Sequence, residues 1–187
     1  MKSSIDLKQE LVLLLSKACE QHFQKIKLSR IYTDIAGYVI YSSSGCRNLG
    51  IALCTQEKFS ELSSEKYFAV NWDCINDYSE MFDEVEEKID EIYSVFYDGE
   101  LADINLDSFN NDQLWSFISC FLTDVIVNVY SRLDRAGFFL NEAFSEKVMR
   151  GLQFGDPDEY SLPLVFNVSK HVNAPDIHSC LLAKFRE

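Results

Sequence analysis

Apolar residues recur at helical spacing in three long segments of this chain, residues 4–29, 79–97 and 113–135. In residues 79–97 they form one stripe, and acidic residues occupy the opposite side of the predicted helix. The stripe consists of Phe82, Val85, Ile89, Ile92 and Phe96. In residues 113–135 apolar side chains cover more than half of the circumference. This pattern predicts a long buried core helix that Gly137 terminates.

β-branched and aromatic residues concentrate between the first two of these segments. Residues 35–41 and 49–53 each predict a strand. The Ser- and Gly-containing residues 42–45 between them indicate a β-hairpin whose loop is longer than two residues. Thr55 is a suitable N-cap for a short helix after the hairpin. Residues 67–72 (YFAVNW) predict a third strand.

The order of elements, with strands clustered before helices, favours an α+β fold over a series of βαβ units. Residues 148–154 predict a further strand and residues 164–172 a helix, whereas the last ten residues are ambiguous. We therefore expect a small antiparallel sheet, made of the hairpin and one or two further strands, packed against several helices. The length of 187 residues and a hydrophobic content of 47% suit a single domain over residues 1–187.

Negative charge is confined to one part of the chain. The whole protein has a formal net charge of −13, and residues 73–112 alone contain fourteen acids and a single base, Lys88. The other acids and bases balance. A concentrated field of one sign speeds encounter with partners of the opposite sign and repels those of the same sign. The expected partner is therefore basic, and nucleic acid and anionic membranes are disfavoured.

The polar side of the 79–97 helix, with the start of the following loop, is the candidate binding surface. Surface helices usually mix charges, because like pairs at i,i+4 cost about 0.2–0.5 kcal/mol each. Glu80–Glu84 and Glu87–Glu91 are like pairs, which suggests that the charge serves a partner; an ordinary solvated face is the alternative. The predicted partner-binding residues are Glu80, Asp83, Glu84, Glu87, Asp90, Glu91, Asp98 and Glu100. Those on the helix are expected to be exposed.

No motif of a catalytic, cofactor or metal site is found in the sequence. His22, His171 and His178 share no metal-ligand spacing, and His22 is expected at the surface or in a capping role. There is no GxSxG elbow and no glycine-rich phosphate loop. We expect no enzyme activity, no catalytic residue, no cofactor and no metal; an enzyme with an unrecognised site is the remaining alternative.

Three features of the sequence predict a cytoplasmic protein. The six cysteines lack paired CxxC spacing, which favours free thiols in a reducing compartment. No secretory signal is visible. The most apolar stretch, residues 114–133, contains Asp124, Asn128 and Arg132, so we expect a buried helix rather than a membrane span.

The order of motifs resembles a family of small bacterial α+β domains. The motifs are an amphipathic helix, GYVIYSSSGCRNLGIALCTQEKF, YFAVNW, an acidic helix, a long apolar helix and GFF. The similarity covers most of the chain and rests on the hairpin, Trp72, Phe82 with Val85, and Gly137-Phe138-Phe139.

Some members of that family are encoded beside polymorphic toxins, and they resemble immunity proteins of contact-dependent growth inhibition systems. The resemblance implies no catalytic residue. It implies an inhibitor that binds and neutralises a basic toxin domain, an RNase or a DNase, whose cleft is basic because it binds phosphates. Tight binding would also need an apolar or aromatic anchor within the charged surface. The alternative is an acidic adaptor domain for an unrelated basic protein.

Overall fold

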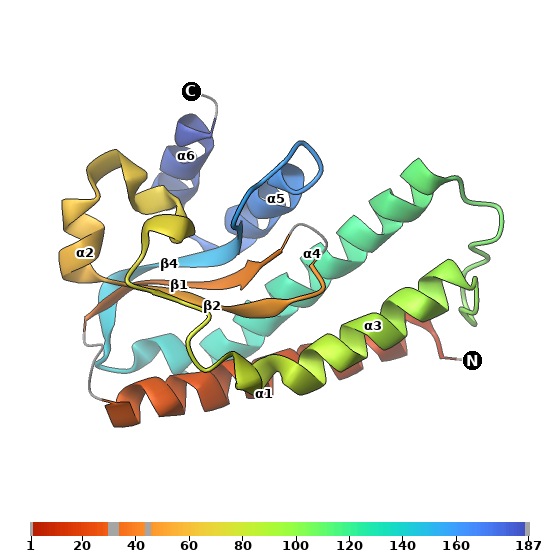
Figure 1. The fold of residues 1–187 in the computed structure, drawn as a ribbon, viewed down its shortest axis with the longest axis horizontal. Coiled ribbons are helices and arrows are strands. Elements are labelled where there is room, and N and C mark those ends of the chain that lie inside the picture. The colour runs from red at the N-terminus through yellow and green to blue at the C-terminus, as the bar shows by residue number, and fades with distance from the viewer. Residues whose placement is uncertain (1, 30–33, 44–45, 186–187) are drawn as a thin grey trace.

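The computed structural model describes residues 2–29, 34–43 and 46–185. Within them, six α-helices flank a four-stranded sheet (Figure 1). The helices are α1 (Ser4–Ser29), α2 (Gln56–Glu61), α3 (Asp83–Tyr97), α4 (Asn111–Arg135), α5 (Leu162–Val172) and α6 (Pro175–Lys184). The strands are β1 (Ile35–Ser42), β2 (Leu49–Thr55), β3 (Cys74–Ile75) and β4 (Phe144–Phe154).

The α+β class is confirmed, but the sheet is mixed rather than antiparallel. Its strand order is β3-β2-β1-β4. β1 and β2 form the predicted antiparallel hairpin, whereas β4 runs parallel to β1, with Tyr38 opposite Arg150. The parallel pairing arises because α3 and α4 return the chain to the end of the sheet where β1 begins. Of the predicted turn at 42–45, Ser44 and Gly45 lie outside the described residues.

Both faces of β1 are covered, and all eight of its residues are buried. On one face, the Tyr38 ring contacts His22 of α1 and Phe138 after α4. On the other face, Gly37 lies under Trp72, and a Cβ added to Gly37 would be 2.6 Å from the indole ring. Buried side chains from the strands, α1, α3, α4 and α5 form one apolar cluster.

The predicted third strand over residues 67–72 is wrong. Tyr67 ends one short 3₁₀ helix, Ser63–Tyr67, and a second, Ala69–Asn71, lies between Phe68 and Trp72. The third strand is the two-residue β3. Trp72 folds back so that its Nε1 donates to the Lys66 carbonyl at 2.9 Å. The aromatic content that suggested a pleated strand instead fills a loop packed over the sheet.

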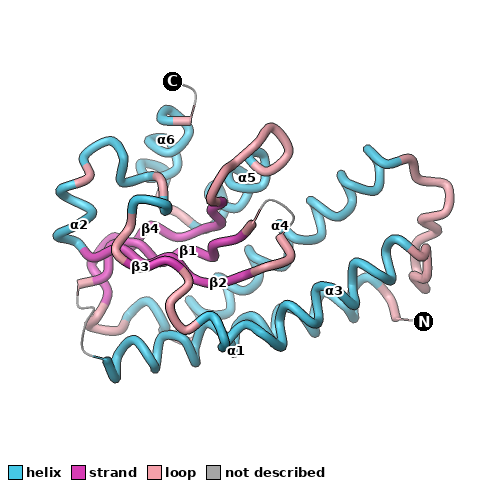
Figure 2. Tube along the Cα trace, viewed as in Figure 1, coloured by secondary structure: helices cyan, strands magenta, loops and turns pink. Residues whose placement is uncertain are grey.

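α3 and α4 extend past the sheet as an antiparallel helical hairpin, the α3–α4 arm (residues 83–135; Figures 1 and 2). The arm is held together by Phe96 of α3, whose ring centroid lies 5.1 and 5.0 Å from those of Phe117 and Phe121 of α4. Its connecting loop is tied to the chain's N-terminus, because Asp103 accepts hydrogen bonds from the backbone N and the hydroxyl of Ser4.

α4 is the predicted core helix. Eight of its side chains are buried, and Gly137 follows it at φ 73°, the left-handed conformation expected of a helix stop. By length and mean hydropathy, 1.4, α4 would suffice to cross a membrane. Its packing against α1 and α5 is instead that of a partly buried helix, which is consistent with a soluble protein.

Candidate protein-binding surface

The acidic helix has the two sides that its sequence predicts. A 3₁₀ turn, Ser79–Phe82, leads directly into α3, so the helical segment spans the predicted 79–97. All five residues of the apolar stripe are buried. All eight predicted partner-binding residues, Glu80, Asp83, Glu84, Glu87, Asp90, Glu91, Asp98 and Glu100, are exposed.

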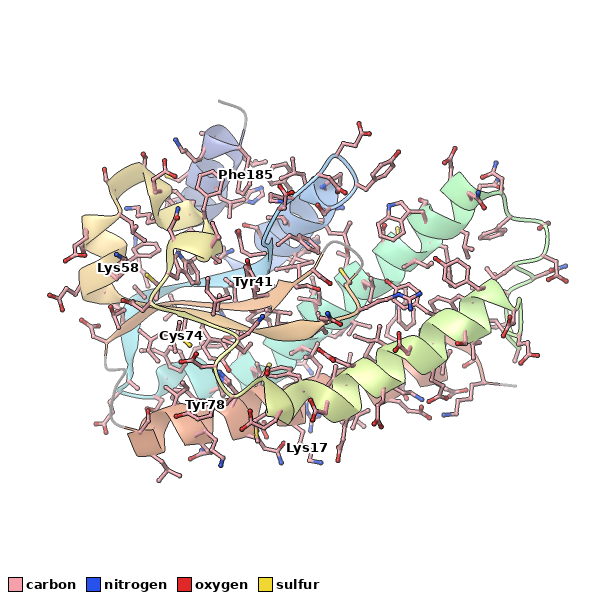
Figure 3. All side chains as sticks on the ribbon, viewed as in Figure 1. Lys17, Tyr41, Lys58, Cys74, Tyr78 and Phe185 are labelled. Atoms are coloured by element: carbon pink, nitrogen blue, oxygen red, sulfur yellow. The ribbon has the colours of Figure 1, made fainter. Side chains whose placement is uncertain are left out.

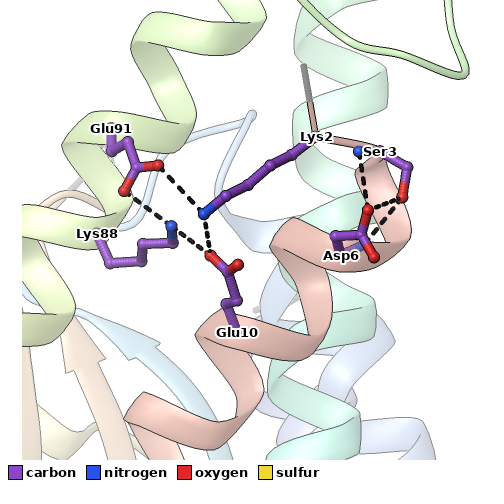
Figure 4. A network of polar contacts seen from close by, with 6 residues as sticks. All are labelled: Lys2, Ser3, Asp6, Glu10, Lys88 and Glu91. Carbon is purple, nitrogen blue, oxygen red and sulfur yellow. Dashed lines mark hydrogen bonds and ion pairs between the residues drawn. The ribbon is translucent and has the colours of Figure 1, made fainter.

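The flank of α3 that faces α1 is bound by ion pairs within the chain (Figure 4). Lys88, whose side chain is 9% exposed, contacts Glu91 at 2.8 Å and also Glu10 of α1. Lys2 completes the network, 2.7 Å from Glu10 and 3.7 Å from Glu91. Hydrogen bonds from Lys2 and Lys88 lower the pKa of Glu10, and the bond from Lys88 lowers that of Glu91.

Further along the same flank, Lys17 Nζ of α1 lies 3.2 Å from Glu84 Oε2. Lys17 is at the lower edge of the molecule in Figure 3. The network and this pair both stabilise the packing of α1 on α3, so these carboxylates have a structural use.

The opposite flank of α3 faces the hairpin. Arg47 lies 3.2 Å from Asp90, and Glu86 Oε1 accepts a hydrogen bond from the backbone N of Leu49 at 3.2 Å. At the other end of β2, Asp73 accepts from the backbone N and the hydroxyl of Thr55. Because β3 pairs with only two residues of β2, these acids satisfy strand groups that would otherwise form an open sheet edge.

Three of the eight predicted residues, Glu84, Asp90 and Glu91, therefore already have cationic partners, and the free field is smaller than the sequence predicts. The other five have no ion pair among the described residues. We call them the outer acidic row: Glu80, Asp83, Glu87, Asp98 and Glu100. They follow the solvent side of α3 and continue onto the loop of the arm.

A second feature, which the sequence does not reveal, is a groove of about 580 Å³ between α4 and the start of α5, here called the α4–α5 groove. Its lining includes the aromatic residues Trp115 and Tyr160 and three carboxylates, Asp112, Asp124 and Glu159. Among the described residues, no Lys or Arg lines the groove, although Lys8 pairs with Asp124 from outside at 2.6 Å. These residues come from segments more than thirty positions apart, so no local pattern could have indicated the groove.

Both walls of the α4–α5 groove are fixed by local hydrogen bonds. α4 begins with a capping box, in which Asn110 and Gln113 each bond the other's backbone N at 2.9 Å. Before α5, Asp158 Oδ1 accepts from the backbone N of Ser161 at 2.8 Å, and the Ser161 hydroxyl lowers the pKa of Asp158. The groove is thus a preformed feature of the fold.

The groove also contains Cys120 and His171, the residue types of a thiol nucleophile and its base. His171 Nδ1 is 2.7 Å from the Asn167 carbonyl of its own helix. Within the described part of the chain, no hydrogen bond joins His171 to Cys120, and no three metal-ligating side chains cluster.

The cysteines fall into two groups. None of the six forms a disulfide; Cys120 and Cys180 are exposed, and the other four are buried. Burial raises the pKa of the Cys46 thiol to about 12, which disfavours the reactive thiolate. Chemical reactivity is therefore expected at Cys120 and Cys180.

The expectation that His22 lies at the surface or caps a helix is wrong. Its side chain is fully buried, with Nδ1 3.2 Å from the Tyr38 hydroxyl and Nε2 3.1 Å from the Asp77 carbonyl. Burial lowers its pKa to about 4. The sequence did hold a signal, because helical spacing from Cys19 and Ile26 places position 22 on the buried side of α1.

Comparisons of the chain with protein-family models, with curated proteins and with solved structures find no match. Its function is therefore inferred from the geometry and charge of the outer acidic row and the α4–α5 groove.

Proposed function

We propose that this chain is a cytoplasmic immunity protein that binds and neutralises a basic toxin domain, an RNase or a DNase, and that has no catalytic activity of its own. The observation that carries the proposal is the outer acidic row. Five exposed carboxylates without ion pairs among the described residues run from the 3₁₀ turn before α3, along its solvent side, to the loop after it, on an arm that projects beyond the sheet. The acids on the flanks of α3 are paired with cations of the chain, so the outer acidic row supplies the negative charge that a partner would contact.

A nuclease suits this surface for a physical reason. Its active cleft is basic because it binds phosphates, and a row of carboxylates presents the same charge as the nucleic acid backbone. Such a row steers association and favours the basic cleft over other surfaces. The same charge repels nucleic acid and anionic membranes, so a protein partner is favoured.

The alternative is an acidic adaptor domain for a basic protein that is not toxic. Both functions use the outer acidic row, and they differ in what the partner does. An immunity protein must abolish a toxic activity, whereas an adaptor needs only to bind.

The test is co-expression with the protein encoded beside this chain. We expect that protein to be basic, to arrest growth when produced alone, and to be harmless when this chain is present. A triple variant, Glu80→Lys, Asp83→Lys and Glu87→Lys, should lose protection while remaining folded by circular dichroism. These positions are exposed, and each substitution should change stability by no more than about 0.5 kcal/mol.

The matched control reverses three exposed acids away from the α3–α4 arm, Glu20, Glu57 and Glu146. Protection by the control but not by the triple variant supports the proposal. A basic neighbour that binds but is not toxic favours the adaptor. Full protection by the triple variant would show that the outer acidic row is only a solvated face.

A further inference from the structure

The α4–α5 groove combines carboxylates with aromatic rings in one concavity. Asp112 and Glu159 are exposed, and within the described residues neither has an ion pair. Tyr160 is 58% exposed and Trp115 is partly exposed. Large exposed aromatic residues beside acids are matched to a cation that also has a flat apolar face.

The groove is linked to the end of the outer acidic row through Trp115 and Tyr97. Trp115 also lines a smaller hollow of about 280 Å³ on its other side, together with Tyr97, Leu114 and Ile118. Tyr97 is the last residue of α3 and directly precedes Asp98 of the row. A partner lying along the row is therefore led to the indole of Trp115 and, past it, into the groove.

The groove wall contains one unsatisfied polar group. The hydroxyl oxygen of Ser119 is buried and has no hydrogen-bond partner among the described residues. Buried polar atoms are normally paired, and this hydroxyl is an exception in the groove wall.

We propose that the α4–α5 groove receives an arginine-bearing loop of a basic protein partner, with the guanidinium group over Trp115 and between Asp112 and Glu159. This inference rests on the proposed function and identifies the anchor of the interface. Arginine fits better than lysine, because its planar group stacks on an aromatic ring and donates to carboxylates in parallel pairs. A volume of about 580 Å³ exceeds one side chain, so neighbouring residues of the loop enter with it.

Cys120 offers a direct readout of occupancy, because it lines the groove and its thiol is exposed. In a Cys180→Ser variant, Cys120 is the one exposed thiol among the remaining five. The probe is a short end-blocked peptide with two arginines. Its control is the same peptide with citrulline, which keeps the shape of arginine and removes the charge.

The arginine peptide, at up to millimolar concentration, should slow the reaction of Cys120 with a thiol reagent, and the citrulline peptide should not. Trp115→Ala should weaken this protection about tenfold, the loss expected for a partly desolvated cation–π contact. The double variant Asp112→Asn with Glu159→Gln should also weaken the protection of Cys120. It leaves Trp115 in place, so its effect is separate from any change in the packing of that ring. Neutralising the outer acidic row at Glu80, Asp83 and Glu87 should leave the protection in place.

Equal protection by both peptides, or none by either, would overturn the inference. Full protection by free arginine alone would also overturn it, because the groove would then be a small-molecule site. The toxin itself separates the two proposals. A toxin that is neutralised without protecting Cys120 leaves the proposed function standing and removes the groove from the interface. If the arginine peptide protects Cys120 but no toxic partner is found, the groove remains an arginine-binding site and the proposed immunity function falls.

Discussion

The flanks of α3 and its outer side carry the same residue types but differ in their surroundings. On the flanks, Glu84, Asp90 and Glu91 each contact a cation of the chain, and Glu86 accepts a hydrogen bond from a strand. The outer acidic row has no ion pair among the described residues. The run of acids thus divides into two groups, because some of its members contact cations or strand amides of the chain and the others leave an uncompensated negative field.

Association rates with the basic partner should differ most between the outer acidic row and the flank acids. Neutralising the row with Glu80→Gln, Asp83→Asn and Glu87→Gln should lower the association rate with the basic partner by about tenfold to a hundredfold at low salt. The dependence on salt should weaken as well, because exposed charges are screened beyond about 8 Å at physiological ionic strength. Stopped-flow or biolayer interferometry over a salt series measures both.

The control neutralises two flank acids, Glu84→Gln with Asp90→Asn. Their charge is already offset by Lys17 and Arg47, so the rate should change much less. If the flank variant slows association as strongly as the row variant, the distinction between paired and unpaired acids has no functional meaning.

Acid titration separates the flank network from the buried core. Folding lowers the pKa of His22 from 6.5 to about 4. Between pH 4 and pH 6.5, His22 is therefore protonated in the unfolded chain and neutral in the folded chain. Stability should therefore fall by on the order of 3 kcal/mol as the pH drops from 6.5 to 4. The lowered pKa values of Glu10 and Glu91 act in the same direction, but below their ordinary value of 4.5.

Urea unfolding at a series of pH values checks this assignment. His22→Gln should flatten the dependence between pH 4 and 6.5 and leave the loss below pH 4.5. His171→Gln, on the exposed side of α5, is the control and should keep the wild-type slope. An unchanged slope in His22→Gln would rule out the buried imidazole as the cause.

Removing the central cation of the flank network should cost less. Lys88→Met keeps the apolar stem but breaks the contacts with Glu10 and Glu91, and we expect a loss of about 1–2 kcal/mol. The value is below that of a fully buried pair, because both carboxylates are about half exposed. Glu87→Met, one residue earlier on the outer side, should change the urea midpoint little; equal losses would contradict the comparison.

The smallest expected effect lies at the edge of β2. Glu86→Ala removes the acceptor for the Leu49 amide, and we expect a loss of about 1 kcal/mol in the free energy of unfolding. Glu87→Ala should stay within about 0.5 kcal/mol of wild type. Hydrogen exchange at the Leu49 amide gives a local check, since only Glu86→Ala should accelerate it.

Features with a local cause were predictable. The helical spacing of the apolar residues located α1, α3 and α4, because a helix buries one side every 3.6 residues wherever it packs. Thr55 caps α2 with its own hydroxyl, an interaction that spans three residues. The exposure of Glu80, Asp83 and Glu87 followed from the same periodicity, since these carboxylates lie opposite the buried stripe.

Local patterns in the sequence were enough to predict α1 to α5, the hairpin, the α+β class and the location of the acidic segment, whereas α6 was not predicted. Which acids form ion pairs depends on the tertiary structure, because the cations are remote in sequence: Lys17 and Glu84 are 67 positions apart, and Arg47 and Asp90 are 43. The tertiary structure likewise set β4 parallel to β1, turned residues 67–72 into a packed loop, and formed the α4–α5 groove. The periodicity of a segment indicates which of its side chains are buried and which face solvent. Ion pairs, strand pairing and grooves depend instead on which distant segments the fold brings together.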